Sequence, residues 1–207
     1  MTMTEPHRVE TERLVLRVWS VDDAPALDRL YVESHEHLAE AGMLERGAPP
    51  AAGTAATRIA AMLAAAERGE RISYAAWDRA SGALVGSVSL IARFGPGGRE
   101  IGYWVHGGFV RRGLATEMAA AVTRVAFEVL RLPFVELRTG KSNVASVGVA
   151  RALGYRLEAT LPRRIPLPDG TTDDSLIFCL HADDYPASPS ARRAIEVFAR
   201  DGTPLAI

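Results

Sequence analysis

The chain has 207 residues, of which 48% are hydrophobic and 24% are charged, as is usual for a soluble globular protein. Its 24 Lys and Arg against 25 Asp and Glu leave a net charge near zero, which excludes the broad positive field of a nucleic-acid-binding protein. Residues 59–66 form the longest strictly apolar run, which is far too short to span a membrane.

The first ten residues lack the apolar segment of a signal peptide, and the single Cys179 fits a reducing compartment. We therefore expect a cytoplasmic protein with no membrane or nucleic-acid partner. Because Cys179 lies in the apolar stretch SLIFCL, we expect it to pack as a small buried side chain and not to act as a nucleophile.

The first half of the chain predicts strands and helices in alternating groups. Alternating polarity and β-branched content predict strands over residues 13–19, 72–78, 83–92 and 100–106. The stretch SVDD, Ser20 to Asp23, offers capping side chains before a predicted helical stretch that runs to about residue 40, and a second helix is predicted over residues 54–68. Gly and Pro predict loops or turns over residues 42–53, 79–82 and 94–99.

The clearest helix follows Gly113, because Met118, Val122, Val125 and Val129 recur at spacings of four and three. Further along, the pattern predicts strands over residues 134–139, 156–167 and 171–180, a turn at 168–170, and a helix over 145–153 that ends at Gly154. Mixed strands and crossover helices favour an α/β or α+β layered fold. We expect one domain over residues 1–185 and an extension of undetermined structure over 186–207.

The junction between the strand at 100–106 and the next helix has the features of an anion site. A helix start leaves backbone N–H groups unpaired and carries a partial positive charge. Gly113 allows a close backbone approach, Thr116 adds a hydroxyl, and Arg111 and Arg112 add charge. The alternative is a plain turn with solvated arginines. The chain contains neither the G-x-x-x-x-G-K-[ST] loop nor the G-x-G-x-x-G motif, so two common nucleotide sites are excluded.

Three stretches, in this order, resemble the GNAT superfamily of acyl-CoA-dependent N-acetyltransferases. They read TERLVLRVWSVDDAPAL at residues 11–27, EIGYWVHGGFVRRGLATEM at 100–118 and VELRTGKSNVASVGVARALGY at 135–155. The first stretch is similar to the branch that includes ribosomal-protein N-terminal acetyltransferases. The resemblance covers about residues 10–185. It implies a mixed, mostly antiparallel sheet of about seven strands flanked by about four helices.

The resemblance also implies acetyl-CoA as the acyl donor and a primary amine as the acceptor. The family's phosphate signature, Q/R-x-x-G-x-G/A, falls on residues 110–115, where Gly113 and Ala115 match and Val110 does not. The resemblance implies that coenzyme A is bound by Tyr103, Trp104, Val105, Val110, Arg111, Arg112, Gly113, Leu114, Ala115, Thr116, Asn143 and Ser146. The backbone of the first three is expected to hold the pantetheine arm and the thioester.

Two carboxylates are candidates for the general base that takes the proton of the amine. Glu100, at the start of the strand that leads to the junction, is the first candidate, and its alternative is an exposed strand-end carboxylate. Glu136 is the second, and its alternative is an ion pair with Arg138 or a neighbour.

For the leaving thiolate, the tyrosine of some family members would fall at Ala150 and is absent. Ser146 could instead hydrogen-bond the thiolate, as the branch resemblance implies, or cap the helix, and Asn143 could bind the pantetheine arm or form the turn that starts the helix.

The histidines show no ligand spacing, so we expect no metal. The acceptor is a protein N-terminus or a small-molecule amine, and we expect its pocket around residues 28–67 and the hairpin over 156–180. The alternative function is a non-catalytic acyl-CoA-binding module or sensor, which Val110 and the missing tyrosine keep open. A homodimer is also open.

Overall fold

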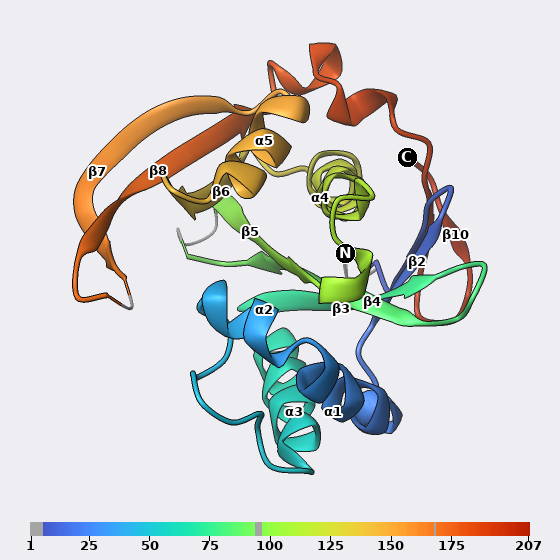
Figure 1. Cartoon of the computed structure of the whole chain (residues 1–207). Helices are drawn as coiled ribbons and strands as arrows, with labels where there is room; N and C mark the ends of the chain where they lie inside the picture. Colours follow the sequence, from blue (N-terminus) through green and yellow to red (C-terminus); the bar gives the residue numbers. More distant parts are fainter. Residues whose placement is uncertain (1–5, 94–96, 168) are drawn as a thin grey trace.

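The computed structural model describes residues 6–93, 97–167 and 169–207 (Figure 1). Its strands are β1 (Arg8–Glu10), β2 (Leu14–Val18), β3 (Arg71–Asp78), β4 (Leu84–Ile91), β5 (Gly98–Val105), β6 (Phe134–Gly140), β7 (Arg156–Pro166), β8 (Thr172–His181), β9 (Glu196–Phe198) and β10 (Pro204–Leu205). Its α-helices are α1 (Ala24–Glu33), α2 (His35–Glu40), α3 (Thr54–Glu67), α4 (Leu114–Arg124) and α5 (Val144–Ala152).

The strands form one sheet in the order β10-β9-β1-β2-β3-β4-β5-β6-β8-β7. All neighbours pair antiparallel except β5 and β6, which are parallel. The predicted layered α/β class and mostly antiparallel sheet are therefore confirmed. The predicted count of about seven strands is too low, because β1, β9 and β10 have only two or three residues each and show no readable alternation.

Helices cover both faces of the sheet and define two apolar cores. Helices α4 and α5 lie on one face and α1, α2 and α3 on the other (Figure 1). Met118 and Val122 of α4, and Val125 directly after it, are fully buried, as their spacing predicts, whereas Val129 is only partly buried. Helix α4 ends in one π-helical turn, Val125–Val129. No helix among the residues described is long and apolar enough to cross a membrane.

The helical stretch predicted between SVDD and about residue 40 begins at Ala24 and is interrupted at Ser34, which separates α1 from α2. Ser34 has a non-helical backbone and is buried, and its Oγ accepts a hydrogen bond from the N–H of Gly107 at 2.9 Å. This contact joins residues 73 positions apart. A pattern of local apolar spacing therefore could not predict the break.

Residues 186–207, whose structure the sequence leaves undetermined, extend the sheet. Strand β9 pairs with β1, and β10 pairs with β9. Val197 is 2% exposed in the main core, and the C=O of Arg193 accepts a hydrogen bond from Arg124 of α4 at 2.5 Å. The C-terminal residues thus extend the sheet beyond β1, which would otherwise be its edge strand.

Two predicted turns fall partly outside the described residues. Positions 94–96 of the turn at 94–99 and Pro168 of the turn at 168–170 are not among them. Strand β5 begins at Gly98, two residues before its predicted start. Gly154 follows α5 with a φ of 87°, as expected for a residue that ends a helix.

Candidate active site

Strands β5 and β6 separate halfway along their length. Their parallel pairing runs from Gly98↔Phe134 to Ile101↔Leu137 and stops there. Strand β5 continues along β4 as far as the Val105↔Gly86 pair, and β6 continues along β8. The edge of residues 102–105 that faces β6 therefore has backbone N–H and C=O groups that no described strand pairs, and an extended ligand can hydrogen-bond there.

Beyond β5 the chain forms the junction that the sequence singles out. A 3₁₀ turn, Gly107–Phe109, leads to a bend in which Arg111 and Gly113 have φ values of 59° and 75°. The first hydrogen bond of α4 runs from the N–H of Glu117 to the C=O of Gly113 at 3.1 Å. None of the N–H groups of residues 111–116 donates to another residue in the described part of the chain. The bend therefore presents unpaired amides beside two exposed arginines, as an anion site requires.

The bend is fixed from outside by Arg13, which precedes β2. Arg13 donates from Nη1 to the C=O of Arg112 at 2.9 Å and from Nε to Glu117 at 2.7 Å. Glu117 also accepts from the Thr11 hydroxyl at 2.6 Å and lies in the first turn of α4, where a carboxylate is favourable. Sequence spacing could not reveal this clamp, because its partners are about 100 residues apart.

The other end of the junction is held to α1 by His106. Its Nδ1 accepts from the N–H of Gly108 at 2.9 Å, which leaves the proton on Nε2, 3.1 Å from a carboxylate oxygen of Glu33. Phe109 and Val110 pack against the main core, so Val110 supplies packing where the family signature has a polar side chain.

Glu100 is a buried carboxylate on β5 and not an exposed strand end. It is 8% exposed, and Arg93 Nε lies 2.8 Å from its Oε2. Burial raises the pKa of Glu100, while the positive charges of Arg93 and Arg138 oppose the shift. A carboxylate with a raised pKa is a stronger base once it is ionised.

Glu136 lies directly beside Glu100 on β6. Its Oε2 accepts from Arg138 Nε at 3.0 Å, which is the ion pair that the sequence offered as the alternative to a catalytic role. The negative charge of Glu136 contributes to the raised pKa of Glu100. Glu136 therefore acts on the first candidate base, Glu100, through its charge.

The side chains of β5 alternate between the two faces of the sheet. Tyr103 packs with the core under α4, whereas Trp104 packs with the core under α1 and α3. Glu100 and Gly102 share the face of Trp104. The open edge of β5 is thus bordered by Glu100 on one face of the sheet and by the Tyr103 phenol on the other.

The hydroxyl of Tyr103 is buried beside Ser146, at the start of α5. Burial raises the pKa of Tyr103 to about 12, and the Ser146 hydroxyl partly offsets the shift. No described group meets full hydrogen-bond geometry with the Tyr103 oxygen. The sequence assigned only the backbone of Tyr103 to the site, so its side chain is a missed candidate that the alternation of β5 could have indicated.

The N-cap of α5 is Asn143 and not Ser146. Asn143 Oδ1 accepts from the Ser146 N–H at 3.1 Å. Because this contact uses the Ser146 N–H, the Ser146 hydroxyl is available to face Tyr103. Asn143 is exposed, and its amide nitrogen has no partner among the described residues.

A pocket of about 450 Å³ opens on the face of Glu100 and Trp104. Its walls come from α1, α3 and strands β3–β5, including Trp19, Tyr31, Met62, Arg71, Ile91 and Trp104. This volume suits a small ligand or a short peptide end. The expected contribution of residues 28–67 is present, whereas no described residue of the late hairpin lines this pocket.

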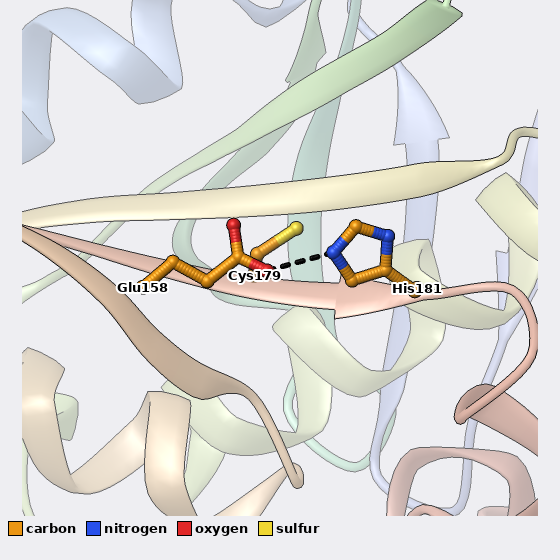
Figure 2. Close-up of side chains that lie close together, drawn as sticks. All are labelled: Glu158, Cys179 and His181. Carbon is orange, nitrogen blue, oxygen red and sulfur yellow. Dashed lines mark hydrogen bonds and ion pairs between the residues drawn. The ribbon is translucent and has the colours of Figure 1, made fainter.

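A second polar cluster lies on the hairpin of β7 and β8 (Figure 2). Ligand atoms of Glu158, Cys179 and His181 lie within 4.8 Å of one another, and His181 Nε2 is 2.7 Å from Glu158. Burial and the carboxylates of Glu158 and Glu136 raise the pKa of Cys179 to about 12. The thiol therefore stays protonated at neutral pH and packs as a small buried side chain.

The structure brings most predicted site residues to one place. Residues 103–105 and 110–116 border the open edge of β5 and the bend that follows, Glu100 and Glu136 lie on one face, and Ser146 lies on the other. Sequence reasoning missed Arg13, Arg71 and the Tyr103 side chain, because no local motif marks them.

Comparison with known proteins gives the family. The sequence profile described as "Acetyltransferase (GNAT) domain" matches residues 13–156, well over half of the chain. A search among curated proteins gave no significant match.

Solved structures with the same fold include three acetyltransferases. A probable acetyltransferase aligns with a TM-score of 0.74 and 23% identity over 84% of this chain and 95% of that one. A RimL ribosomal L7/L12 α-N-protein acetyltransferase in complex with coenzyme A aligns with 0.72 and 18% over 84% and 96%. A ribosomal-protein-S5-alanine acetyltransferase from Vibrio fischeri aligns with 0.71 and 17% over 86% and 98%. The matched profile and the separated parallel strands beside a helix-start bend agree, and the chain belongs to the GNAT acetyltransferase family.

Proposed function

We propose that the protein transfers an acetyl group from acetyl-CoA to a primary amine by direct attack. One observation carries the proposal: β5 leaves β6 after Ile101 and ends in a bend with unpaired amides. One strand thereby offers hydrogen bonds to an extended arm and, at its end, a cradle for a diphosphate.

The donor would be held mainly by backbone. The amides of residues 111–116, with Arg111 and Arg112, would bind the pyrophosphate. The open edge at residues 103–105 would bind the pantetheine arm, and the amide nitrogen of Asn143, at the start of α5, would donate to the same arm. Because most of these contacts come from backbone, the loss of a polar side chain at Val110 is compatible with binding.

The two proton transfers of the reaction would take place on opposite faces of β5. The amine nitrogen attacks the thioester carbon, the carbon–sulfur bond breaks, and Glu100 accepts the proton that the nitrogen loses. The departing thiolate takes a proton from Tyr103, whose hydroxyl retains it at neutral pH. The Ser146 hydroxyl, which lies beside the phenol, would help to position it.

The need for a base depends on the acceptor. At pH 7.5 about a third of α-amino groups with a pKa of about 7.8 are neutral, but only about one lysine amine in 800 at a pKa of about 10.4. An α-amine therefore needs little help from Glu100, and a lysine or polyamine needs much more.

Binding and turnover are measured separately to test the proposal. Calorimetric titration with acetyl-CoA and coenzyme A release across a panel of amines form the experiment, with Glu100→Gln and the exposed Glu36→Gln as a matched pair. We expect Glu100→Gln to keep donor binding and to lower turnover, most strongly for amines of high pKa, while Glu36→Gln keeps both. Absence of donor binding contradicts the proposal.

A second function, a non-catalytic acyl-CoA-binding module, is favoured by one observation, the packed Val110 in place of the polar signature residue. Donor binding without coenzyme A release on any amine would select it.

A further inference from the structure

The pocket of about 450 Å³ contains a cation that has no anionic partner among the described residues. Arg71, on β3, lines the pocket on the α3 side, and its side chain is partly buried. Within the described residues its guanidinium donates no hydrogen bond and forms no ion pair within 4 Å. A partly buried guanidinium normally carries a carboxylate or several acceptors, because its five N–H groups lose water on burial.

The nearby carboxylates are already occupied. Glu70, which also lines the pocket, accepts two hydrogen bonds from Arg68 at 2.8 and 2.7 Å. Glu100 is 2.8 Å from Arg93 and interacts more strongly with Arg93 and Arg138 than with Arg71. The positive charge of Arg71 is therefore not neutralised by the acids around the pocket.

A second arginine adds to the excess of positive charge. Arg58, exposed on α3, also lines the pocket. Its described contacts are with a neutral group: Nη1 donates to the Tyr31 hydroxyl at 3.3 Å, and the guanidinium lies 5.1 Å from the Tyr31 ring centre. The pocket thus has two arginines with no carboxylate of their own among apolar walls such as Trp19 and Met62.

Arg71 is placed to bind one end of an acceptor whose other end reaches β5. Arg71, Ile91 and Glu100 pair across β3, β4 and β5 and therefore lie in one row on one face. Gly102, at the open edge, is two residues further along β5. With strands about 4.8 Å apart and a rise of about 3.4 Å per residue, Arg71 and Gly102 are about 12 Å apart at Cα. A long arginine side chain and a small acidic amine can bridge this distance.

We propose, on the basis of the acetyltransferase function above, that the acceptor is a primary amine that carries a carboxylate, and that Arg71 binds this carboxylate with support from Arg58. The planar guanidinium fork matches a carboxylate in a bidentate arrangement. Trp19 and Trp104 exclude water from the pair and strengthen it.

The test uses two acceptors that differ only in charge: C-terminally amidated dipeptides that begin with serine and carry glutamate or glutamine second. Coenzyme A release gives kcat/KM for each, and thermal shift in the presence of coenzyme A gives binding without turnover. We expect the acidic peptide to be preferred by about 10- to 100-fold, the range of a charge-assisted hydrogen-bonded pair. Arg71→Gln should abolish the preference, because it lowers kcat/KM for the acidic peptide about 10- to 100-fold more than for the neutral one. Arg151→Gln, at an exposed position on α5, is the matched control and should keep the preference.

The outcomes separate this inference from the function on which it rests. Turnover with equal or better use of neutral or cationic amines overturns the carboxylate assignment and leaves acetyl transfer intact. Equal loss on both peptides in Arg71→Gln assigns a structural role to Arg71 and also overturns it. Without turnover, an Arg71-dependent thermal shift with the acidic peptide alone supports the carboxylate site even though the transferase proposal fails.

Discussion

Arg13 and Glu117, 104 residues apart in the chain, form a salt bridge that holds the start of α4 against the N-terminal segment. The same arginine binds the C=O of Arg112, so one side chain fixes both sides of the bend around Gly113. Local sequence makes this bend possible, but a distant residue holds its shape.

Loss of that clamp should weaken donor binding. We expect Arg13→Gln to raise the Kd for acetyl-CoA by about 5- to 30-fold, equivalent to about 1–2 kcal/mol for two lost charge-assisted hydrogen bonds at an exposed site. Arg68→Gln removes another exposed arginine that pairs with a carboxylate, and it should leave the Kd unchanged. Isothermal titration calorimetry checks both variants. Equal Kd values would show that the clamp has no role in shaping the bend.

Gly113→Ala should have a similar effect through backbone conformation. A Cβ at Gly113 meets only Arg13 Nη2, at 3.7 Å, so space is available. The φ of 75° is the difficulty, since an L-residue there is disfavoured by about 1–2 kcal/mol. We expect weaker acetyl-CoA binding with a modest fall in Tm. Gly148→Ala, in an open position within α5, should keep binding and hold or raise Tm. Unchanged affinity in Gly113→Ala would contradict a backbone cradle.

The pH dependence of turnover should report Glu100. Because burial raises its pKa, activity should fall as pH decreases through a value above the ordinary glutamate pKa of about 4.3. The pH at which activity falls on the acidic side should stay the same when the acceptor amine is changed. Glu100→Gln should abolish this fall. The measurement is kcat/KM against pH for two amines of different pKa. If the pH of this fall moved with the pKa of the amine, the titrating group would be the substrate and not Glu100.

Tyr103→Phe should lower kcat and leave donor binding nearly unchanged. Removal of a proton donor lowers the rate by about 10²- to 10⁴-fold. Since the pKa of Tyr103 is about 12, the parent enzyme should show no alkaline limb from this group below pH 9. Tyr155→Phe is the control, because the Tyr155 hydroxyl bonds Thr123 in the core at 2.8 Å. That variant should lose stability and keep kcat.

The C-terminal residues should contribute to the stability of the folded domain. Val197→Asp places a charge at a position that is 2% exposed between β1 and β10, which costs several kcal/mol. We expect Tm to fall by 10 °C or more, roughly, for a domain of this size. Ala206→Asp, at an exposed position, should leave Tm unchanged. Thermal unfolding followed by circular dichroism compares the two.

The sequence alone determined the layered fold, most strands and the helix-start bend, because these depend on local alternation, helical spacing and the position of Gly113. The position of Glu100 before the bend and the family resemblance of the Ser146 segment also predicted these two as site residues. The tertiary structure alone decided the break at Ser34, the clamp by Arg13, the unpartnered Arg71 and the Tyr103 phenol beside Ser146. Each of these depends on contacts between segments far apart in the chain, and local periodicity carries no information about which distant side chains meet.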